Sequence, residues 1–578
     1  MKKRNRSLAL FLAMMLAVST FSGCGGKKTE EPQVTPAQTE AGETGETGET
    51  GGEAEWDGNM DNLYVIDIMP PTPLITASMD TAVGQYIAEK FGIAFNYIQY
   101  SGDITEKQAL MLAGSEYNEI QYMQGEDIFK KYIDAGALLN LDDYKDLMPD
   151  FYKRYEKIIP YWRASAADGG LYKWERDTPT ETETTLTHTD VLVRTDVLEY
   201  YGWPELVSAS DWREFLAKAV KDFPTTYDGQ ATVGMTMPMA ESYGIQGIVP
   251  VGYEKGDTYF GSGNDYHIYN IKTGQFEEYL LAPEVKESFQ FFNNLYKDGT
   301  LDEECFTDSA DITLQKLSNG RAIAAWYVTW NQGSANQELT NAGHPEMSYI
   351  QMPFQLDSQV GQDYMLSMRA SYPYYSMGIT KNCKYPERVA KFINWCCTDE
   401  GQIVLQSGLE GVHYTVENGE RVPTDLFRQC SQDVEVQKKE GVIGALSGLP
   451  LCNSYAEDGQ PFNLAQTWEF VDGFSLTDRE KEAYAGLGWS TSNQWWNEHC
   501  KGFDAGYFQS CALDPSSDLG KVGAKMTEVR VKYSANLLMA DDFEAVWNEL
   551  MAEYDKLDHE PVIEAMNETL AGFTEALK

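Results

Sequence analysis

The chain has 578 residues, 42% of them hydrophobic and 23% charged, which is ordinary for a folded protein of more than one domain. Acidic side chains number 89 against 45 basic ones, giving a formal net charge of -44. Such a surface repels phosphate groups and anionic headgroups, so the charge excludes nucleic-acid binding and electrostatic binding to anionic membranes.

The N-terminal residues have the pattern of an export signal. Basic side chains within residues 2–6 precede an apolar run at residues 8–18, which is too short to span a bilayer. Small residues stand directly before Cys24, which resembles the lipobox of bacterial lipoproteins, although Phe21 stands where leucine is more usual. The alternative is an ordinary secretory peptide with a chance cysteine, and both predict an exported protein.

The lipobox resemblance implies that residues 1–24 are a lipoprotein signal peptide and that Cys24 carries the lipid, including palmitate. The mature protein would then be held on the extracellular face of the cell membrane of a Gram-positive bacterium. Residues 25–58 repeat Gly-Glu-Thr and contain almost no large apolar side chains, so we predict a disordered acidic tether between anchor and folded body.

The first part of the body alternates between two hydrophobic periods. Residues 63–69, 94–100 and 119–123 have the pattern of strands, and residues 80–91 and 103–112 have that of helices. Strands that alternate with helices indicate a largely parallel α/β sheet.

Later segments add helices with one apolar stripe and one hairpin. Residues 211–221, the helices that begin at Pro283 and Pro386, and a terminal helix at residues 541–551 each carry such a stripe, which we interpret as core. Asn418 and Gly419 form a strong hairpin signal.

Eight cysteines follow Cys24, and their pairing is open. Export permits disulfides, but the spacing shows no CxxC pair. Cys396 and Cys397 are predicted core thiols, whereas Cys430 with Cys452, or Cys500 with Cys511, could bridge loops.

Residues 314–331 carry the main functional signal. A predicted helix ends at Asn319 and Gly320, and an apolar strand at residues 322–327 then runs into Trp330 and Asn331. For any single aromatic ring the core is the commoner place. Three such rings within five residues, at a strand end and beside an asparagine, favour a sugar site, because a sugar offers CH faces and a hydroxyl rim.

Several loose motifs then occur in a familiar order. After the leader and the tether they are residues 103–119, 192–198, 318–322 and 381–401. In this order they resemble the extracellular solute-binding proteins of oligosaccharide ABC importers, in particular large Gram-positive lipoproteins and alginate-binding proteins.

The resemblance implies an α/β, two-lobed fold of the type II periplasmic-binding-protein kind, with a ligand cleft between the lobes. The N-terminal lobe would hold residues 59–190 plus 355–408, and the C-terminal lobe residues 191–354 plus 409–578. The protein would be a monomer that captures an oligosaccharide and delivers it to separate ABC permease subunits. The sequence has no Walker-type loop of its own, which agrees with a separate ATPase.

The resemblance also nominates ligand-binding residues. Trp330 falls where maltose-class binders place a sugar-stacking tryptophan, and Trp326 with Tyr327 falls where alginate binders place one. An exposed or structurally bonded imidazole is an equal alternative for the two histidines in the set. The expected residues are Gln124, His188, Trp326, Tyr327, Trp330, Asn331, Glu410, His413 and Tyr414, together with Tyr372, Tyr374 and Trp468.

The chain departs from some alginate-type relatives in one loop. Those relatives carry calcium after the helix that matches residues 211–221, but residues 222–230 lack the alternating carboxylates of an EF-like loop. We therefore expect no metal there, and no cofactor elsewhere.

Two other functions compete. A cell-surface carbohydrate-active enzyme would need catalytic groups, yet there is no GxSxG or HExxH motif, and paired carboxylates in so acidic a chain are uninformative, so we expect no enzyme. A binder of peptides or another solute with the same fold would use tryptophan and tyrosine as well.

Overall fold

The structure is a computed structural model, and it describes the folded body with several gaps. The described residues are 58–71, 73–175, 191–241, 244–260, 266–367, 376–452, 454–467, 470, 476–490, 492–503, 511, 513–514 and 516–576. The predicted signal, lipidation site and most of the tether lie outside them. Within the described part, no helix combines the length and the hydrophobicity needed to cross a membrane.

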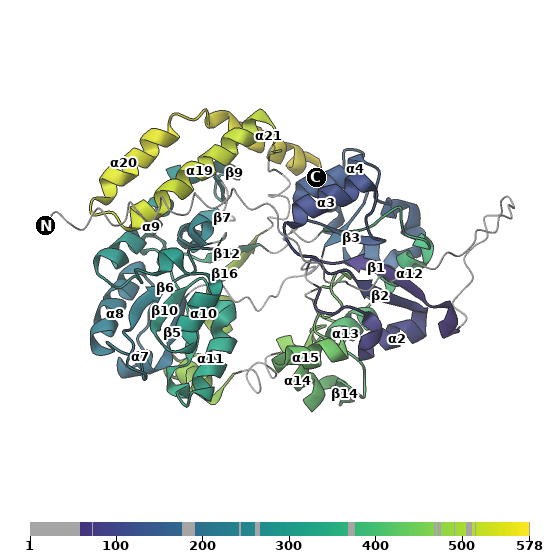
Figure 1. The fold of residues 1–578 in the computed structure, drawn as a ribbon, viewed down its shortest axis with the longest axis horizontal. Helices are drawn as coiled ribbons and strands as arrows, with labels where there is room; N and C mark the ends of the chain where they lie inside the picture. Colours follow the sequence, from purple (N-terminus) through teal and green to yellow (C-terminus); the bar gives the residue numbers. More distant parts are fainter. Residues whose placement is uncertain are drawn as a thin grey trace, which may run out of the picture. The chain divides into compact units, whose positions relative to one another are not determined.

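One body, here called the first lobe, is built on a five-stranded sheet (Figure 1). The strand order is β2-β1-β3-β13-β4, with β1 parallel to β2 and β3, and β13 antiparallel to β3 and β4. The strands are β1 (Tyr64–Met69), β2 (Ile93–Tyr97), β3 (Ile120–Met123), β4 (Trp174–Glu175) and β13 (Ser376–Ile379). The predicted parallel α/β pattern is confirmed for β1 to β3.

Capping residues fix the ends of helices in the first lobe. Asp103 caps α3 by accepting from the backbone N–H of Glu106, and Gly92 closes α2 in the left-handed region, as the sequence predicted. The helices are α2 (Ala82–Phe91), α3 (Ile104–Gly114), α4 (Gly125–Asp134), α5 (Pro149–Arg154), α6 (Ile159–Arg163), α12 (Pro386–Cys396), α13 (Asp399–Ser407), α14 (Asp425–Gln432) and α15 (Val434–Glu440).

The second lobe has a four-stranded sheet of order β11-β5-β10-β6. Strand β5 is antiparallel to both β11 and β10, and β10 is parallel to β6. The strands are β5 (Val191–Arg194), β6 (Val233–Thr236), β10 (Ala322–Trp326) and β11 (Tyr349–Met352). All five residues of β10 are buried, so this strand runs through the interior of the lobe.

Helices surround this sheet, α8 and α11 among them (Figure 1). The helix predicted at residues 541–551 is present as α20, but it is not terminal, because α21 follows it. Helix α21 packs against β9 (Gln275–Glu278) through Asn567, whose side chain makes hydrogen bonds with the backbone of Phe276. The helices are α7 (Thr195–Tyr200), α8 (Ala209–Asp222), α9 (Pro283–Lys297), α10 (Ala310–Ser318), α11 (Gln332–Asn341), α17 (Asp478–Gly486), α18 (Ser492–His499), α19 (Asp518–Leu538), α20 (Phe543–Tyr554) and α21 (Glu560–Ala576).

Smaller sheets complete the lobes. The predicted hairpin at Asn418 and Gly419 is confirmed, since both residues have positive φ angles between β14 and β15. The remaining strands are β7 (Tyr259–Phe260), β8 (His267–Asn270) and β9 (Gln275–Glu278) in one sheet, β12 (Tyr364–Ser367) with β16 (Cys500–Phe503), and β14 (Tyr414–Glu417) with β15 (Glu420–Pro423).

Two segments lie in a different lobe from the one that the sequence predicted for them. Apolar side chains between Tyr414 and Phe470 join the core of the first lobe, although residues 409–578 were expected in the other lobe. The side chain of Gln402 on α13 holds this segment, since it donates to Pro450 O and accepts from Cys452 N. Conversely, Leu356 joins the core of the second lobe, and β12 pairs with β16, although residues 355–408 were expected in the first.

The structure describes all eight cysteines after Cys24, and none of these eight is joined to another in a disulfide. Neither of the two bridges left open by the sequence is formed. Cys452 instead donates its thiol to the phenol oxygen of Tyr155 at 3.3 Å, inside the core of the first lobe. The prediction that Cys396 and Cys397 are core thiols is confirmed, because both are buried.

Candidate functional site

Three strand ends meet at one edge of the second-lobe sheet. Trp326, the last residue of β10, and Met352, the last of β11, both pair with Val191, the first of β5. In open α/β sheets, ligands bind outside the carboxyl ends of the strands. The residues that follow β10 therefore lie at a position suited to ligand contact.

Tyr327 turns the chain sharply at this edge. Its φ angle is 60°, in the left-handed region that bulky side chains rarely adopt. Such a conformation costs about 1–3 kcal/mol and persists where surrounding structure enforces it, often at functional sites. The short helix Thr329–Asn331 follows, and Trp330 within it is 52% exposed.

The two predicted tryptophans have opposite environments. The expectation that Trp326 binds ligand is contradicted by its burial, because its ring lies 5.3 Å from that of Phe292 and 4.8 Å from that of Phe354, both edge-on, in the core of the second lobe. Trp330 presents an indole to solvent. The strained turn at Tyr327 separates the two rings.

Polar groups continue from Trp330 into α11. Asn331 occupies the N-cap position without making a side-chain cap bond. Gln332 donates to Glu480 Oε1 at 2.6 Å and accepts from Gln351 Nε2 at 3.0 Å. The other amide atom of Gln351, Oε1, is buried and accepts no hydrogen bond from a described residue. Sequence reasoning nominated Asn331 but missed Gln332 and Gln351.

In the first lobe, Gln124 stands directly after β3 as predicted. Its backbone N–H donates to Gln108 Oε1 at 2.9 Å, and its side-chain oxygen accepts from the phenol of Tyr122. Gln108 in turn donates to Tyr122 O at 2.6 Å. This network fixes Gln124 at the carboxyl end of β3, where its half-buried side chain reaches the surface.

A buried ionic cluster at the same sheet edge was missed by sequence reasoning. Lys173 Nζ lies 2.9 Å from Glu175 Oε1, 3.8 Å from Glu126 Oε2 and 3.3 Å from Ser376 Oγ. Burial alone would lower the pKa of Lys173, but the two carboxylates outweigh it and raise that pKa above its usual value. The signal in the sequence was Glu126, which stands two residues after Gln124 and lies in the first turn of α4.

The expected residues after α13 lie in the first lobe. His413 is fully buried, accepts from Leu409 N through Nδ1 at 2.9 Å, and has Nε2 3.3 Å from Glu440 Oε2. Burial lowers its pKa, with Glu440 acting in the opposite sense. This is the structurally bonded alternative for that imidazole, and the nomination of His413 as a ligand contact is corrected. Tyr414 is also buried in the core, and Glu410 is exposed beside it.

The structure does not reach the other nominated residues. They lie outside the described part of the chain: Cys24, His188, Tyr372, Tyr374 and Trp468.

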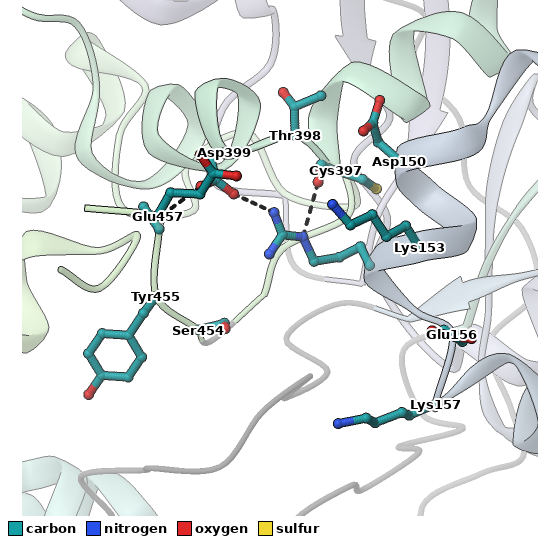
Figure 2. A pocket seen from close by; sticks show the side chains of 12 residues that line it. Asp150, Lys153, Glu156, Lys157, Cys397, Thr398, Asp399, Ser454, Tyr455 and Glu457 are labelled. Atoms are coloured by element: carbon teal, nitrogen blue, oxygen red, sulfur yellow. Dashed lines mark hydrogen bonds and ion pairs between the residues drawn. The ribbon is translucent and has the colours of Figure 1, made fainter. Parts of the chain in front are cut away.

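A separate hollow of about 520 Å³ opens in the first lobe (Figure 2). Lys153, Lys157 and Glu457 are among its charged lining residues, and the nominated ligand residues are not part of that lining. Arg154 binds Asp399 Oδ1 at 2.6 Å and Cys397 O at 3.0 Å, which ties α5 to the start of α13. The hollow is therefore a charged surface feature beside the ion pair of Arg154 and Asp399.

The loop that departs from the calcium pattern is closed by its own side chains. Asp228 accepts from the hydroxyl of Thr226 and from both the backbone and the side-chain nitrogen of Gln230. These bonds lower the pKa of Asp228, that from Thr226 most. Among the described residues, no group of three or more histidine, cysteine or acidic side chains is arranged to hold a metal.

Sequence comparison gives little. No protein-family model matches the chain. One curated relative, an uncharacterized protein in the butB 5' region of Niallia circulans, is 23% identical over 137 residues, which is 24% of this chain. The chain spans about half the length of that relative, 52%.

Solved structures are much more informative about the fold. The substrate-binding protein FusA of an S. pneumoniae ABC transporter, solved with kestose, is similar with a TM-score of 0.61 at 14% identity, over 89% of this chain and 100% of FusA. An HMO-binding, ABC-transporter-associated solute-binding protein of Bifidobacterium longum infantis gives 0.62 at 14% identity, over 88% and 99%.

The alginate-binding protein AlgQ2, solved without calcium, gives a TM-score of 0.56 at 15% identity, over 90% of this chain and all of AlgQ2, 100%. These likenesses extend over nearly the whole described body rather than one sheet. The chain therefore has the two-lobed α/β fold of the solute-binding proteins of ABC transporters.

Proposed function

We propose that the protein is the substrate-binding component of an ABC transporter and that it captures an oligosaccharide. The fold supports a binding protein, and the structural relatives include proteins described as binding kestose, HMO and alginate. The observation that carries the proposal within this chain is the exposed indole of Trp330, placed at the carboxyl edge of the second-lobe sheet by the strained turn at Tyr327.

The chemistry of these residues suits a sugar. The exposed ring of Trp330 offers a flat apolar surface to the CH face of a pyranose or furanose. The half-buried amide of Gln124 offers both donors and acceptors for ring hydroxyls. Asn331 lies next to Trp330 but is only 9% exposed, so its amide is the lesser contact of the two. Binding of this kind is reversible and changes no covalent bond. We propose that the ligand lies between the lobes and that they close on it.

Transport needs further components. We propose that Cys24 carries a lipid anchor, that the monomeric protein is held outside the membrane, and that it delivers its ligand to ABC permease subunits. The basic and apolar pattern before Cys24 supports the anchor. A Cys24→Ala variant in a Gram-positive host should lose labelling by a palmitate analogue and appear in the medium, whereas wild type stays with the membrane.

A thermal-shift screen tests the proposed binding. A ligand that binds only the folded protein raises the midpoint of unfolding by mass action. We expect a rise with at least one neutral oligosaccharide and none with a panel of short peptides. If only peptides raised the unfolding midpoint, the ligand would be a peptide and not a sugar. If hydrolysed sugar appeared on a thin-layer plate, the protein would be an enzyme.

A further inference from the structure

The ionic cluster of the first lobe joins the carboxylates of Glu126 and Glu175 to the buried ammonium group of Lys173, and Lys130, whose side chain is 45% exposed, also lies near Glu126. Lys173 and Glu175 have side chains that are 1% and 0% exposed, and that of Glu126 is 12% exposed. The buried ammonium group of Lys173 thus faces both carboxylates. It lies at hydrogen-bond distance, 2.9 Å, from Glu175, and also over the ring of Phe129, 4.7 Å from the centroid.

Glu126 has cationic neighbours but no hydrogen-bond donor among the described residues. Its two oxygens are shielded from water, and neither accepts a hydrogen bond from a described residue. Its cationic neighbours, Lys130 and Lys173, lie 3.7 and 3.8 Å away, beyond ordinary hydrogen-bond length. A buried carboxylate without donors costs free energy, and such groups call for a partner, which the described residues do not supply here.

The position of Glu126 fits a ligand contact. It lies in the first turn of α4, two residues after Gln124, at the carboxyl end of β3. Ser376 pairs with Met123 and with Glu175, so β13 brings Lys173 and Glu175 to this same edge. Lone carboxylate oxygens at this edge accept from hydroxyl or ammonium groups, and repel a second carboxylate.

We propose that Glu126 is a specificity-determining residue, which accepts hydrogen bonds from the hydroxyl or amino groups of the bound sugar and biases the site toward neutral or amino sugars over uronates. This inference rests on the proposed function. Lys173 does not offset the bias, because Glu175 already engages its ammonium group. Lys130 offsets it little, because its side chain is 45% exposed and water screens its charge. In the second lobe, the side-chain oxygen of Gln351, which accepts no hydrogen bond from a described residue, would likewise favour a ligand that donates hydrogen bonds.

Calorimetric titration of the wild type with matched probes tests the inference. The probes are neutral oligosaccharides, glucosamine oligomers and oligouronates of equal length and linkage, at low and high salt. We expect a neutral or amino sugar to bind, and oligouronates to bind at least about tenfold more weakly. The ratio between these two affinities should fall as the salt concentration rises, because salt screens the repulsion between carboxylates. Tight uronate binding would overturn the inference and leave the proposed function standing, whereas binding of no sugar would overturn both.

A Glu126→Gln variant locates the effect. We expect it to bind the neutral sugar about tenfold to hundredfold more weakly, because a charged acceptor is lost, and to discriminate less against uronates. Asp127→Asn is the matched control, since Asp127 is the next residue and pairs with Lys131 in solvent. Equal sugar affinity of the Glu126→Gln and control variants would overturn the assignment. The salt series on wild type still tests charge selection if the Glu126→Gln variant does not fold.

Discussion

The phenol ring of Tyr327 meets the indole of Trp330 edge-on, with ring centroids 5.8 Å apart and planes at 86°. Edge-to-face pairs of this kind add about 0.5–1.5 kcal/mol to the effect of burial alone. The contact helps to orient the exposed ring of Trp330. It thus couples the backbone turn at Tyr327 to the surface that we propose for the sugar.

Replacing Trp330 by alanine should weaken sugar binding without unfolding the protein. The lost ring contact is worth about 1–3 kcal/mol in affinity, whereas a side chain that is half exposed contributes little to the core. Calorimetric titration and the unfolding midpoint measure the two effects. Tyr200→Ala is the matched control, since Tyr200 is another exposed aromatic of the same lobe, 64% exposed on α7. Unchanged affinity would remove Trp330 from the site.

The backbone turn at position 327 makes a prediction of its own. Asparagine adopts the left-handed region readily, whereas a β-branched residue does so only under strain. Tyr327→Val should therefore be less stable than Tyr327→Asn by about 1–2 kcal/mol, although valine is the more hydrophobic of the two. Denaturant unfolding of the two variants measures the difference. Equal stability would mean that the position does not require a positive φ angle.

His413 predicts a dependence of stability on pH. Its folded pKa lies below its usual value of 6.5, chiefly because of burial. Below pH 6.5 the imidazole of His413 therefore becomes protonated in the unfolded chain but stays neutral in the folded protein. The contribution of His413 to the free energy of unfolding is thus present above that pH and is lost as pH falls toward the folded pKa. Thermal unfolding of wild type and His413→Gln between pH 7.5 and about 5 checks this. The difference between them should shrink as pH falls, and a constant difference would contradict the prediction.

The loop at residues 222–230 predicts indifference to calcium. Asp228 is occupied by bonds from Thr226 and Gln230, which close the loop without a cation. Addition of calcium or of a chelator should therefore leave the unfolding midpoint unchanged, because a ligand that does not bind cannot stabilise. A midpoint that rises with calcium would show that the loop, or another part of the chain, binds the ion.

Local chemistry was enough to predict much of the fold. The strand and cap signals around residues 63–123 led to β1, α2, β2, α3 and β3, and the Asn418-Gly419 pair led to its hairpin, because each depends on neighbouring residues. The assignment of residues 409–470 to a lobe failed for the opposite reason. It depends on contacts such as that between Gln402 and Pro450, 48 residues apart, which leave no local pattern.

The candidate site shows the same limit. The cluster of aromatic residues marked the correct strand end, but the sequence could not tell that Trp326 faces the core and Trp330 the solvent, because a single left-handed residue decides it. The Lys173 cluster could not be predicted from the sequence for a different reason. Glu126 and Lys173 are brought together only when β13 inserts between β3 and β4.

The Lys173 cluster also carries a prediction about stability that is independent of any ligand. Removing one partner of a buried ion pair leaves an uncompensated charge, so Lys173→Met should lower the free energy of unfolding by about 3–5 kcal/mol. Adding Glu175→Gln to it should recover part of that loss, since the stranded charge is then gone. The control is Lys131→Met, whose exposed pair with Asp127 at 2.8 Å should be worth about 0–1 kcal/mol. Denaturant unfolding of the three variants measures these differences in the free energy of unfolding. A Lys173→Met variant as stable as the Lys131→Met control would contradict the prediction and show that water reaches the cluster.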